Sequence, residues 1–151
     1  TNNANPKILA ISGVTCAGKN HLAHAIINRG IGKQVITTTT RNPRQGEIDG
    51  IHYNFLGVND FERKIGMYEF VEHVKIGEDY YGVSHNAISR AMASNKIAVV
   101  IVDPRGDRAV MNYADKRGIG ALSVFIDCNK EEQINRLLVL SLADYLGLKN
   151  V

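Results

Sequence analysis

A glycine-rich loop, placed between an apolar run and an amphipathic stretch, limits the possible folds of this chain more than any other feature. Residues 13–19 read Gly-Val-Thr-Cys-Ala-Gly-Lys and match the pattern G-x-x-x-x-G-K. Residues 7–12, before the loop, are mostly apolar, as in a buried parallel strand. Residues 21–29, after it, carry apolar side chains at helical spacing. A strand, a glycine loop and a helix in this order predict an α/β domain with a parallel sheet.

The chemistry of this loop suits a phosphate group. Glycines let backbone N–H groups point at phosphate oxygens, the start of the helix adds its dipole, and Lys19 can reach the β- and γ-phosphates of a nucleotide. The residues predicted to bind ATP are Gly13, Ala17, Gly18, Lys19 and Asn20. The pattern usually continues with Ser or Thr, whose hydroxyl binds Mg²⁺, so Asn20 predicts a weaker metal ligand. An ordinary glycine turn with a surface lysine is the alternative, and the flanking strand and helix argue against it.

The rest of the chain alternates between expected strands and helices. We expect further strands at residues 35–40, 51–55, 68–74, 80–83, 97–102 and 121–126, and helices at 60–65, 84–94, 106–114 and 130–140. The run at 97–102 is continuous and rich in branched side chains, which predicts a central strand. The middle of the chain is richer in strands and turns. The sequence therefore predicts a core of residues 7–35 and 95–151 and a small mixed α/β insertion of residues 36–88.

Composition excludes several classes of protein. The 151 residues contain no apolar run of the roughly 18–20 residues that cross a bilayer, and no secretory signal pattern. The net charge of +3 is well short of the basic stripe expected of a nucleic-acid binder. The two cysteines, Cys16 and Cys128, do not form a disulfide framework, which favours a reducing compartment. We therefore expect a cytoplasmic protein without membrane or nucleic-acid partners.

A second group of residues predicts another phosphate-binding site. Arg41 and Arg44 are three positions apart around a proline, so both can direct their guanidinium groups at one phosphate dianion. Tyr53 and Tyr81 can donate neutral hydrogen bonds to the same group. Glu72 only accepts hydrogen bonds when ionised, and the Watson–Crick edge of guanine presents N–H donors. These residues therefore form a candidate site for one phosphate dianion and for a base with N–H donors.

The segment of residues 37–55 resembles the guanylate kinase family, which are P-loop nucleoside monophosphate kinases. It reproduces the family pattern T-T-R-x-P-R-x-G-E-x-D-G-x-x-Y-x-F, and the similarity continues at 69–72 and 80–82, covering residues 7 to about 138. The resemblance implies a three-layer P-loop NTPase fold and ATP-dependent phosphorylation of a nucleoside monophosphate, GMP or dGMP by default, with Mg²⁺.

The resemblance also implies roles for single residues. Lys19, Arg41 and Arg136 would be catalytic. Arg41, Arg44, Tyr53 and Tyr81 would bind the acceptor phosphate, and Thr37, Glu72 and Asp103 would line the base pocket. Glu47 and Asp49, in contrast, are expected to be turn and ion-pair residues. The histidines His52, His73 and His85 show no metal-ligand spacing.

The chain departs from the family at three places. Val83 stands where the family usually has Ser or Thr, so no hydroxyl is offered to the guanine carbonyl. Ile101 replaces a second carboxylate two residues before Asp103. After Arg136 the family carries an arginine-rich lid, but residues 138–147 are apolar. These departures predict either a lost lid or lid residues missing from the sequence, and a changed base preference stays open.

Three functions are compatible with this sequence. The first is an ATP-dependent nucleoside monophosphate kinase, with catalysis by positioning and charge neutralisation. The second is a catalytically impaired module that binds a nucleotide or a phosphorylated partner, which Asn20, Ile101 and the absent lid favour. The third is a kinase of a sugar phosphate, which the arginine and tyrosine pattern of residues 41–53 argues against. The intact Lys19 and glycines favour the first.

Overall fold

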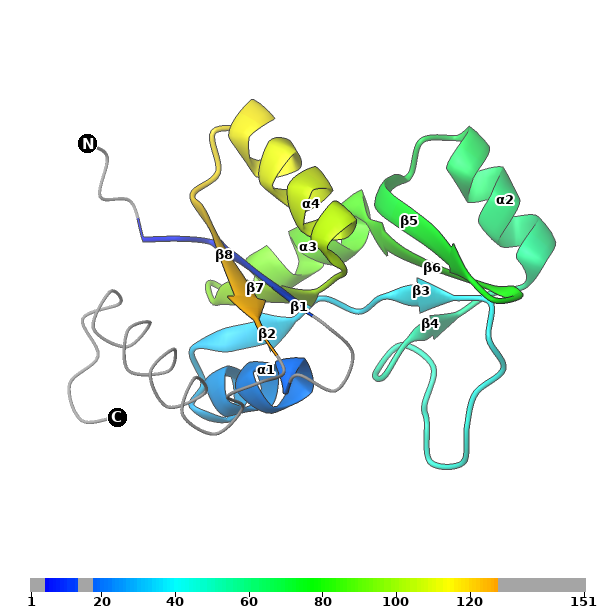
Figure 1. The fold of residues 1–151 in the computed structure, drawn as a ribbon, viewed down its shortest axis with the longest axis horizontal. Coiled ribbons are helices and arrows are strands. Elements are labelled where there is room, and N and C mark those ends of the chain that lie inside the picture. The colour runs from blue at the N-terminus through cyan, green and yellow to red at the C-terminus, as the bar shows by residue number, and fades with distance from the viewer. Residues whose placement is uncertain (1–4, 14–17, 128–151) are drawn as a thin grey trace.

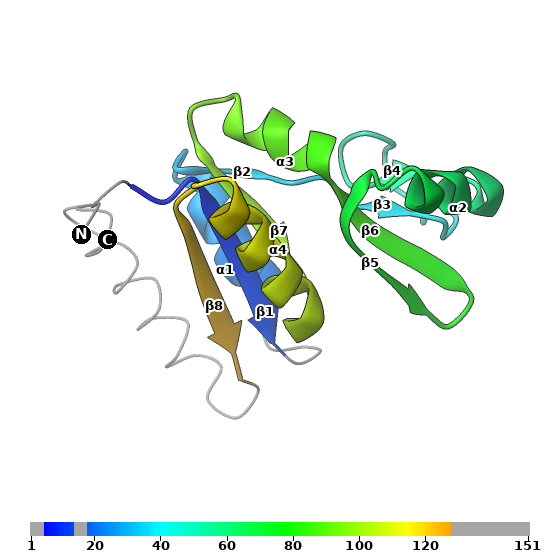
Figure 2. The same cartoon turned by 90° about the horizontal axis from the view of Figure 1, so that it is seen from above.

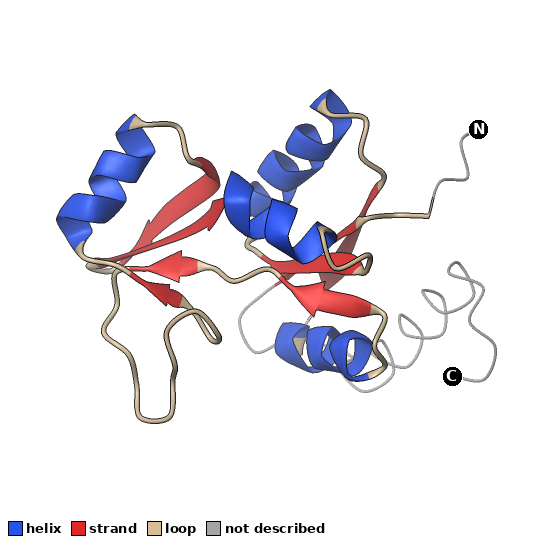
Figure 3. Cartoon of the chain, turned by 180° about the vertical axis from the view of Figure 1, so that it is seen from behind, coloured by secondary structure: helices blue, strands red, loops and turns tan. Residues whose placement is uncertain are grey.

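The computed structural model describes residues 5–13 and 18–127, and within them the chain forms two four-stranded sheets (Figures 1 and 3). The elements of the first half are β1 (Ile8–Gly13), α1 (Lys19–Asn28), β2 (Gly32–Gln34), β3 (Thr38–Thr39), β4 (Asn54–Phe55) and α2 (Val58–Gly66). Those of the second half are β5 (Phe70–Ile76), β6 (Asp79–Ser84), α3 (His85–Met92), β7 (Ile97–Ile101), α4 (Pro104–Lys116) and β8 (Ala121–Ile126). The predicted site residues Ala17 and Arg136, and the helix expected at 130–140, lie outside the described residues.

The first sheet is parallel throughout, with the strand order β2-β7-β1-β8. β1 and β7 occupy its interior, and Ile8 of β1 pairs with Ala98 of β7 and with Ala121 of β8. The prediction of a central strand at 97–102 is confirmed, because β7 lies between β2 and β1. Sequence runs that are apolar at every position occur in such strands since both of their faces are covered.

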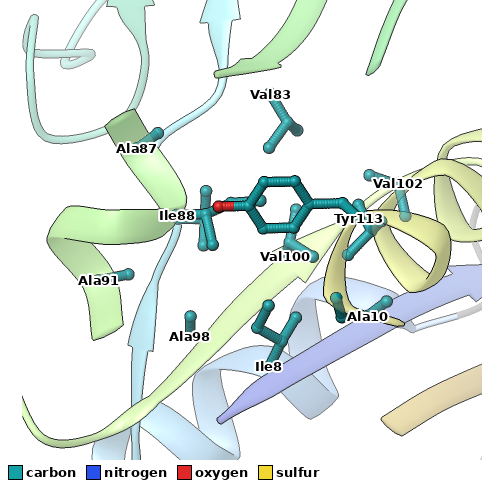
Figure 4. Packing of buried hydrophobic residues seen from close by; sticks show 13 residues of the cluster. Ile8, Ala10, Val83, Ala87, Ile88, Ala91, Ala98, Val100, Val102 and Tyr113 are labelled. Atoms are coloured by element: carbon teal, nitrogen blue, oxygen red, sulfur yellow. The ribbon is translucent and has the colours of Figure 1, made fainter. Parts of the chain in front are cut away.

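Helices cover both faces of the parallel sheet. Ile8 and Ala10 of β1 face the cluster formed with α3 and α4, whereas Leu9 and Ile11 face the cluster formed with α1. Figure 4 shows the first cluster, in which the ring of Tyr113 extends from α4 with its hydroxyl toward Ile88 of α3. The alternation follows from the two-residue period of a strand. The prediction of a three-layer α/β fold with a parallel sheet is therefore confirmed.

The second sheet is mixed and has the order β4-β3-β6-β5. Its β3–β4 pair is parallel, and its β3–β6 and β5–β6 pairs are antiparallel. α2 covers one face through Phe61, which is fully buried and stacks on Phe70 at 4.4 Å and on Tyr80 at 5.1 Å between ring centroids. Figure 2 shows this sheet beside the ends of β1 and α4 rather than stacked on the parallel sheet.

The single strand expected at residues 35–40 is wrong. β2 ends at Gln34 in the parallel sheet and β3 begins at Thr38 in the mixed sheet, so residues 35–37 cross from one sheet to the other. The Val35 N–H still donates to the backbone oxygen of Val99, whereas Thr38 already pairs with Gly82. The β-branched residues of this run suit extended backbone in either sheet, and sequence alone does not show where the pairing partner changes.

Side chains cap the first turns of α3, which connects the two sheets, and of α4, which connects β7 to β8 within the parallel sheet. The Ser84 hydroxyl accepts a hydrogen bond from the Ala87 N–H at the start of α3, which confirms its predicted role as a cap. The Asp103 carboxylate accepts one from the Gly106 N–H at the start of α4.

Among the described residues, no helix combines the length and the apolar composition that a membrane-spanning helix requires.

Gly13 provides a test of how the loop is anchored. Its φ is +148°, and a Cβ at this position would lie 2.2 Å from the backbone oxygen of Ile126 on β8. We expect Gly13→Ala to lower the free energy of unfolding by about 2–4 kcal/mol, because backbone cannot yield as a flexible side chain can. Urea denaturation measures the change.

Gly66→Ala is the matched control. Gly66 ends α2, and a Cβ there would meet nothing within 4 Å. Alanine should be neutral or stabilising by up to about 1 kcal/mol, since it is the better helix former. Equal unfolding midpoints for Gly13→Ala and the parent protein would contradict the assignment of a steric constraint at Gly13.

Candidate functional site

The first part of the site is the start of α1. Gly18 occupies the cap position with a left-handed backbone (φ 86°), and no described side chain caps the helix. The first turn contains no acidic residue, while the Lys19 ammonium donates to the backbone oxygen of Gly13 at 2.9 Å. Asn20 is exposed beside it. The helix dipole and an ammonium group together favour an anion at this end of β1.

The second part of the site lies on the face of the mixed sheet opposite α2. There the structure brings Arg41, Tyr53 and Tyr81 together. The Arg41 guanidinium carbon lies 5.3 Å from the centre of the Tyr53 ring, and the Tyr53 and Tyr81 rings meet edge to face at 6.3 Å. These are three of the four positively charged and phenolic groups that the sequence assigns to one phosphate, and they come from three separate segments of the chain; the fourth group is Arg44.

Glu47 is the ion-pair partner of Arg41. Its two carboxylate oxygens accept from the Arg41 Nη1 and Nη2 groups at 2.8 and 3.0 Å, which confirms the predicted ion-pair role. These hydrogen bonds and one from the Arg44 backbone N–H lower the pKa of Glu47 to about 2. Glu47, more than any other group, raises the pKa of Arg41 above its ordinary value, against the opposing effect of burial; Tyr81 contributes in the same direction as Glu47.

The loop that carries these residues is fixed by local hydrogen bonds. The Asp49 carboxylate accepts from the Phe55 N–H at 2.8 Å, and His52 Nδ1 accepts from the Ile48 N–H at 2.9 Å. Asp49 is therefore a turn residue, as predicted. The Arg44 side chain is exposed, and its backbone N–H donates to Glu47 at 2.7 Å.

Glu72 and Asp103 lie together at the junction of the two sheets. The Glu72 carboxylate packs against the start of α4, where a Cβ on Gly106 would lie 3.0 Å from it. Burial, and to a lesser extent the negative charge of Asp103, raises the pKa of Glu72 to about 7. Thr37 is half-buried on the crossing segment, and its backbone oxygen accepts from the Asn54 N–H at 2.9 Å. Near neutral pH, Glu72 is therefore present both as the uncharged acid and as the carboxylate.

The two substituted positions of the predicted base pocket are apolar and packed. Val83 is fully buried in the cluster with α3 and α4, and Figure 4 shows it beside the Tyr113 ring. It pairs with Glu72 in the β5–β6 register, so both side chains lie on the same face of the sheet. Ile101, at the end of β7, packs against the cluster with α1. At the end of β7, Asp103 therefore supplies a carboxylate, and position 101 does not.

Sequence analysis missed Gly106. This glycine leaves the space that the Glu72 carboxylate occupies, and a Cβ there would also lie 2.9 Å from Cβ of Val102. Its N–H is the one that Asp103 caps. The signal in the sequence was a glycine three residues after an aspartate at the expected start of a helix. Only the packing of the mixed sheet against α4 shows that a side chain at this position would collide with Glu72.

The donor set for a metal ion is limited. Within residues 5–13 and 18–127, no three His, Cys, Asp or Glu side chains gather closely enough to hold one. Asn20 and Asp103 offer oxygen atoms, the ligands that Mg²⁺ prefers, and Mg²⁺ commonly keeps several waters and takes its other ligands from substrate phosphates. These residues fit a Mg²⁺ ion that arrives with a nucleotide.

Comparisons with known proteins agree with this geometry. A family model described as "Guanylate kinase" matches residues 5–141. The chain is 36% identical over 121 residues to a guanylate kinase of Sulfurimonas denitrificans, covering 79% of this chain and 57% of the relative. It is 33% identical over 135 residues to a guanylate kinase of Helicobacter pylori, covering 88% and 63% respectively. The chain therefore spans about three fifths of the length of these relatives.

A solved structure shows the same fold. The crystal structure of guanylate kinase from Anaplasma phagocytophilum superposes with a TM-score of 0.63 at 22% identity, over 94% of this chain and 71% of that one. At this identity the similarity supports the fold.

The raised pKa of Glu72 predicts a pH dependence of stability. Its pKa is about 7 when folded against an ordinary 4.5, so the folded state binds the proton more tightly. The free energy of unfolding should therefore fall as pH rises between those two values, by on the order of 2 kcal/mol. Glu72→Gln should remove this part of the slope, so that the variant gains stability over the parent between about pH 5 and about pH 8.

Urea titrations at both pH values measure the difference between the variant and the parent protein. Glu78→Gln, at an exposed position in the β5–β6 turn, is the matched control and should follow the parent. A stability difference between Glu72→Gln and the parent that stays constant with pH would show that Glu72 keeps its ordinary pKa.

Proposed function

The chain belongs to the guanylate kinase family, and from that premise we propose that it transfers the γ-phosphoryl group of ATP to the phosphate of GMP or dGMP. One observation supports the proposal: two separate groups of residues with cationic or hydrogen-bond-donating groups, one at the start of α1 and one on the mixed sheet. The strand β1 runs toward the side on which the mixed sheet lies (Figure 1). A donor and an acceptor phosphate each have a place in this arrangement.

ATP would bind at the loop that ends in Lys19. The N–H groups at the start of α1 would hold the phosphate chain, and the Lys19 ammonium would exchange its bond to the Gly13 backbone oxygen for phosphate oxygens. Gly13, Ala17, Gly18 and Asn20 complete the proposed ATP site. Mg²⁺, when bound with ATP, would neutralise phosphate charge, with Asn20 and Asp103 as the nearby oxygen donors.

The nucleoside monophosphate would bind on the mixed sheet. We propose that Arg41, Arg44, Tyr53 and Tyr81 hold its phosphate, where two guanidinium groups and two hydroxyls can satisfy a dianion. The proposed base pocket consists of Thr37, Glu72 and Asp103. Ionised Glu72 would accept from the N–H groups of guanine, and because its pKa lies near 7, binding of the base would favour the carboxylate over the acid.

The transfer itself needs no general base. An oxygen of the acceptor phosphate, already anionic, attacks the γ-phosphorus, and the bond from that phosphorus to the bridging oxygen breaks to leave ADP. The chain contributes position and positive charge, which spread over Lys19, Arg41 and, as proposed from the sequence, Arg136. Such charges stabilise the transferring group more than the bound substrates, and this difference accelerates the reaction.

A coupled assay of ADP release tests the proposal directly. With ATP and Mg²⁺, turnover should be fastest with GMP or dGMP among GMP, dGMP, AMP, TMP, UMP and CMP. Lys19→Ala should lower kcat by at least about 100-fold, because the positive charge at the transferring phosphate is lost. No turnover with any acceptor, alongside measurable GMP binding, would instead identify a nucleotide-binding module without kinase activity.

The acceptor clamp makes a separate prediction. Arg44→Ala should raise KM for GMP by about 10–100-fold and leave KM for ATP within about twofold, because the guanidinium acts on the acceptor phosphate alone. Arg63→Ala is the control, since Arg63 is exposed on α2 and pairs with Asp60. Unchanged GMP kinetics in Arg44→Ala would remove Arg44 from the proposed site.

A further inference from the structure

The hydrogen bonds of Arg41 divide its guanidinium group into two edges. Nη1 donates to the Asn42 backbone oxygen at 2.9 Å and to Glu47 Oε1 at 2.8 Å, which uses both of its hydrogens. Nη2 donates one hydrogen to Glu47 Oε2 at 3.0 Å. The other edge, formed by Nε–H and the second Nη2 hydrogen, makes no hydrogen bond with a backbone group or carboxylate of the described residues. Besides Glu47, the side chain that hydrogen-bonds with this guanidinium is the neutral hydroxyl of Tyr81. A bidentate ligand could still bind that edge.

Glu47 itself is held in place from several sides. Its backbone N–H donates to the Arg44 backbone oxygen at 3.0 Å, and its carboxylate accepts from the Arg44 backbone N–H at 2.7 Å. Only 18% of the side chain is exposed. Because its pKa is lowered to about 2, Glu47 is negatively charged throughout the physiological pH range. One carboxylate therefore fixes the side chain of Arg41 and the backbone of Arg44.

The consequence is a preformed direction for Arg41. Its side chain is 15% exposed, and the guanidinium lies over the Tyr53 ring and close to Tyr81. A free arginine loses rotamer freedom when it binds a ligand, whereas one that is already held loses little. The Arg41 backbone is held as well, because its N–H donates to the Thr39 hydroxyl at 3.2 Å.

We propose that Glu47 is a positioning residue for the acceptor phosphate, which holds one edge of Arg41 so that the other edge faces the ligand. The inference rests on the proposed function, because it assigns the ligand of that edge to the phosphate of the nucleoside monophosphate. Glu47 does not touch the substrate and acts through Arg41 and Arg44. It is a fixed support rather than a competitor, since the edge that it occupies is not the edge offered to phosphate.

Calorimetric titrations with GMP and with guanosine test this role. Glu47→Gln keeps the size of the side chain but removes its charge and one acceptor oxygen. We expect Kd for GMP to rise by about 10–100-fold while Kd for guanosine stays within about twofold, because only GMP carries the phosphate that Arg41 binds. In the kinase assay KM for GMP should rise by the same factor, with kcat and KM for ATP within about threefold.

Two further variants keep the test independent of folding. Glu69→Gln, which removes the charge of an ion pair between α2 and the residue before β5 (Lys64–Glu69, 2.6 Å), should bind GMP and guanosine like the parent. Glu47→Asp retains the charge and should recover part of the GMP affinity lost in Glu47→Gln. Far-ultraviolet circular dichroism and the melting temperature verify that each variant is folded.

The remaining outcomes overturn the proposal. Equal weakening of GMP and guanosine would make Glu47 a structural residue of the loop, tighter GMP binding would make it a competitor for Arg41, and unchanged GMP binding would give it no role. A parent protein that binds guanosine but gains nothing from the phosphate of GMP would refute the proposed acceptor site and Glu47 with it. A parent that binds GMP normally but does not turn over would refute the kinase alone, and the selective loss of GMP affinity in Glu47→Gln would then still support the positioning role of Glu47.

Discussion

Burial of β1 and β7 on both faces is the constraint from which the rest of this structure follows. Residues 8–11 of β1 are at most 1% exposed, and alternate side chains join the cluster on one side or the other of the sheet. Parallel strands end at the same edge, so this packing brings the glycine loop after β1 and Asp103 after β7 to one edge. Hydrophobic packing thus determines where the charged chemistry of the protein is placed.

Two glutamates show how the same side chain takes opposite charge states. Glu47 meets an arginine and a backbone N–H, and its pKa falls to about 2, whereas Glu72 is buried near Asp103, and its pKa rises to about 7. The first stays an anion and gives Arg41 a fixed orientation. The second responds to what binds beside it. Electrostatic surroundings, rather than residue type, separate the supporting role that we propose for Glu47 from the base-binding role that we propose for Glu72.

Much of the fold followed from local patterns. The apolar run before Gly13 gave a buried strand, Ser84 capped a helix as expected, and the segment from Arg41 to Tyr53 formed one cluster. Features that depend on partners far away in the sequence could not be predicted from these local patterns. The crossing between sheets before Thr38 is set by pairing with β6, and the need for Gly106 is set by a carboxylate on another strand. The sequence predicted a turn or ion-pair role for Glu47, but only its contacts with both Arg41 and Arg44 indicate a positioning role.

If the proposed transfer takes place between the two sites, one ligand can occupy the loop at Lys19 and the cluster at Arg41 together. Calorimetry with adenosine and guanosine joined through a phosphate chain tests it most directly. If both sites face one another, the joined molecule should bind at least about 100-fold more tightly than GMP, because the second site is filled without a second loss of translational freedom. A control ligand with adenosine at both ends of the same phosphate chain should show a smaller gain in affinity over GMP. An affinity for the joined molecule no greater than that for GMP alone would contradict the account.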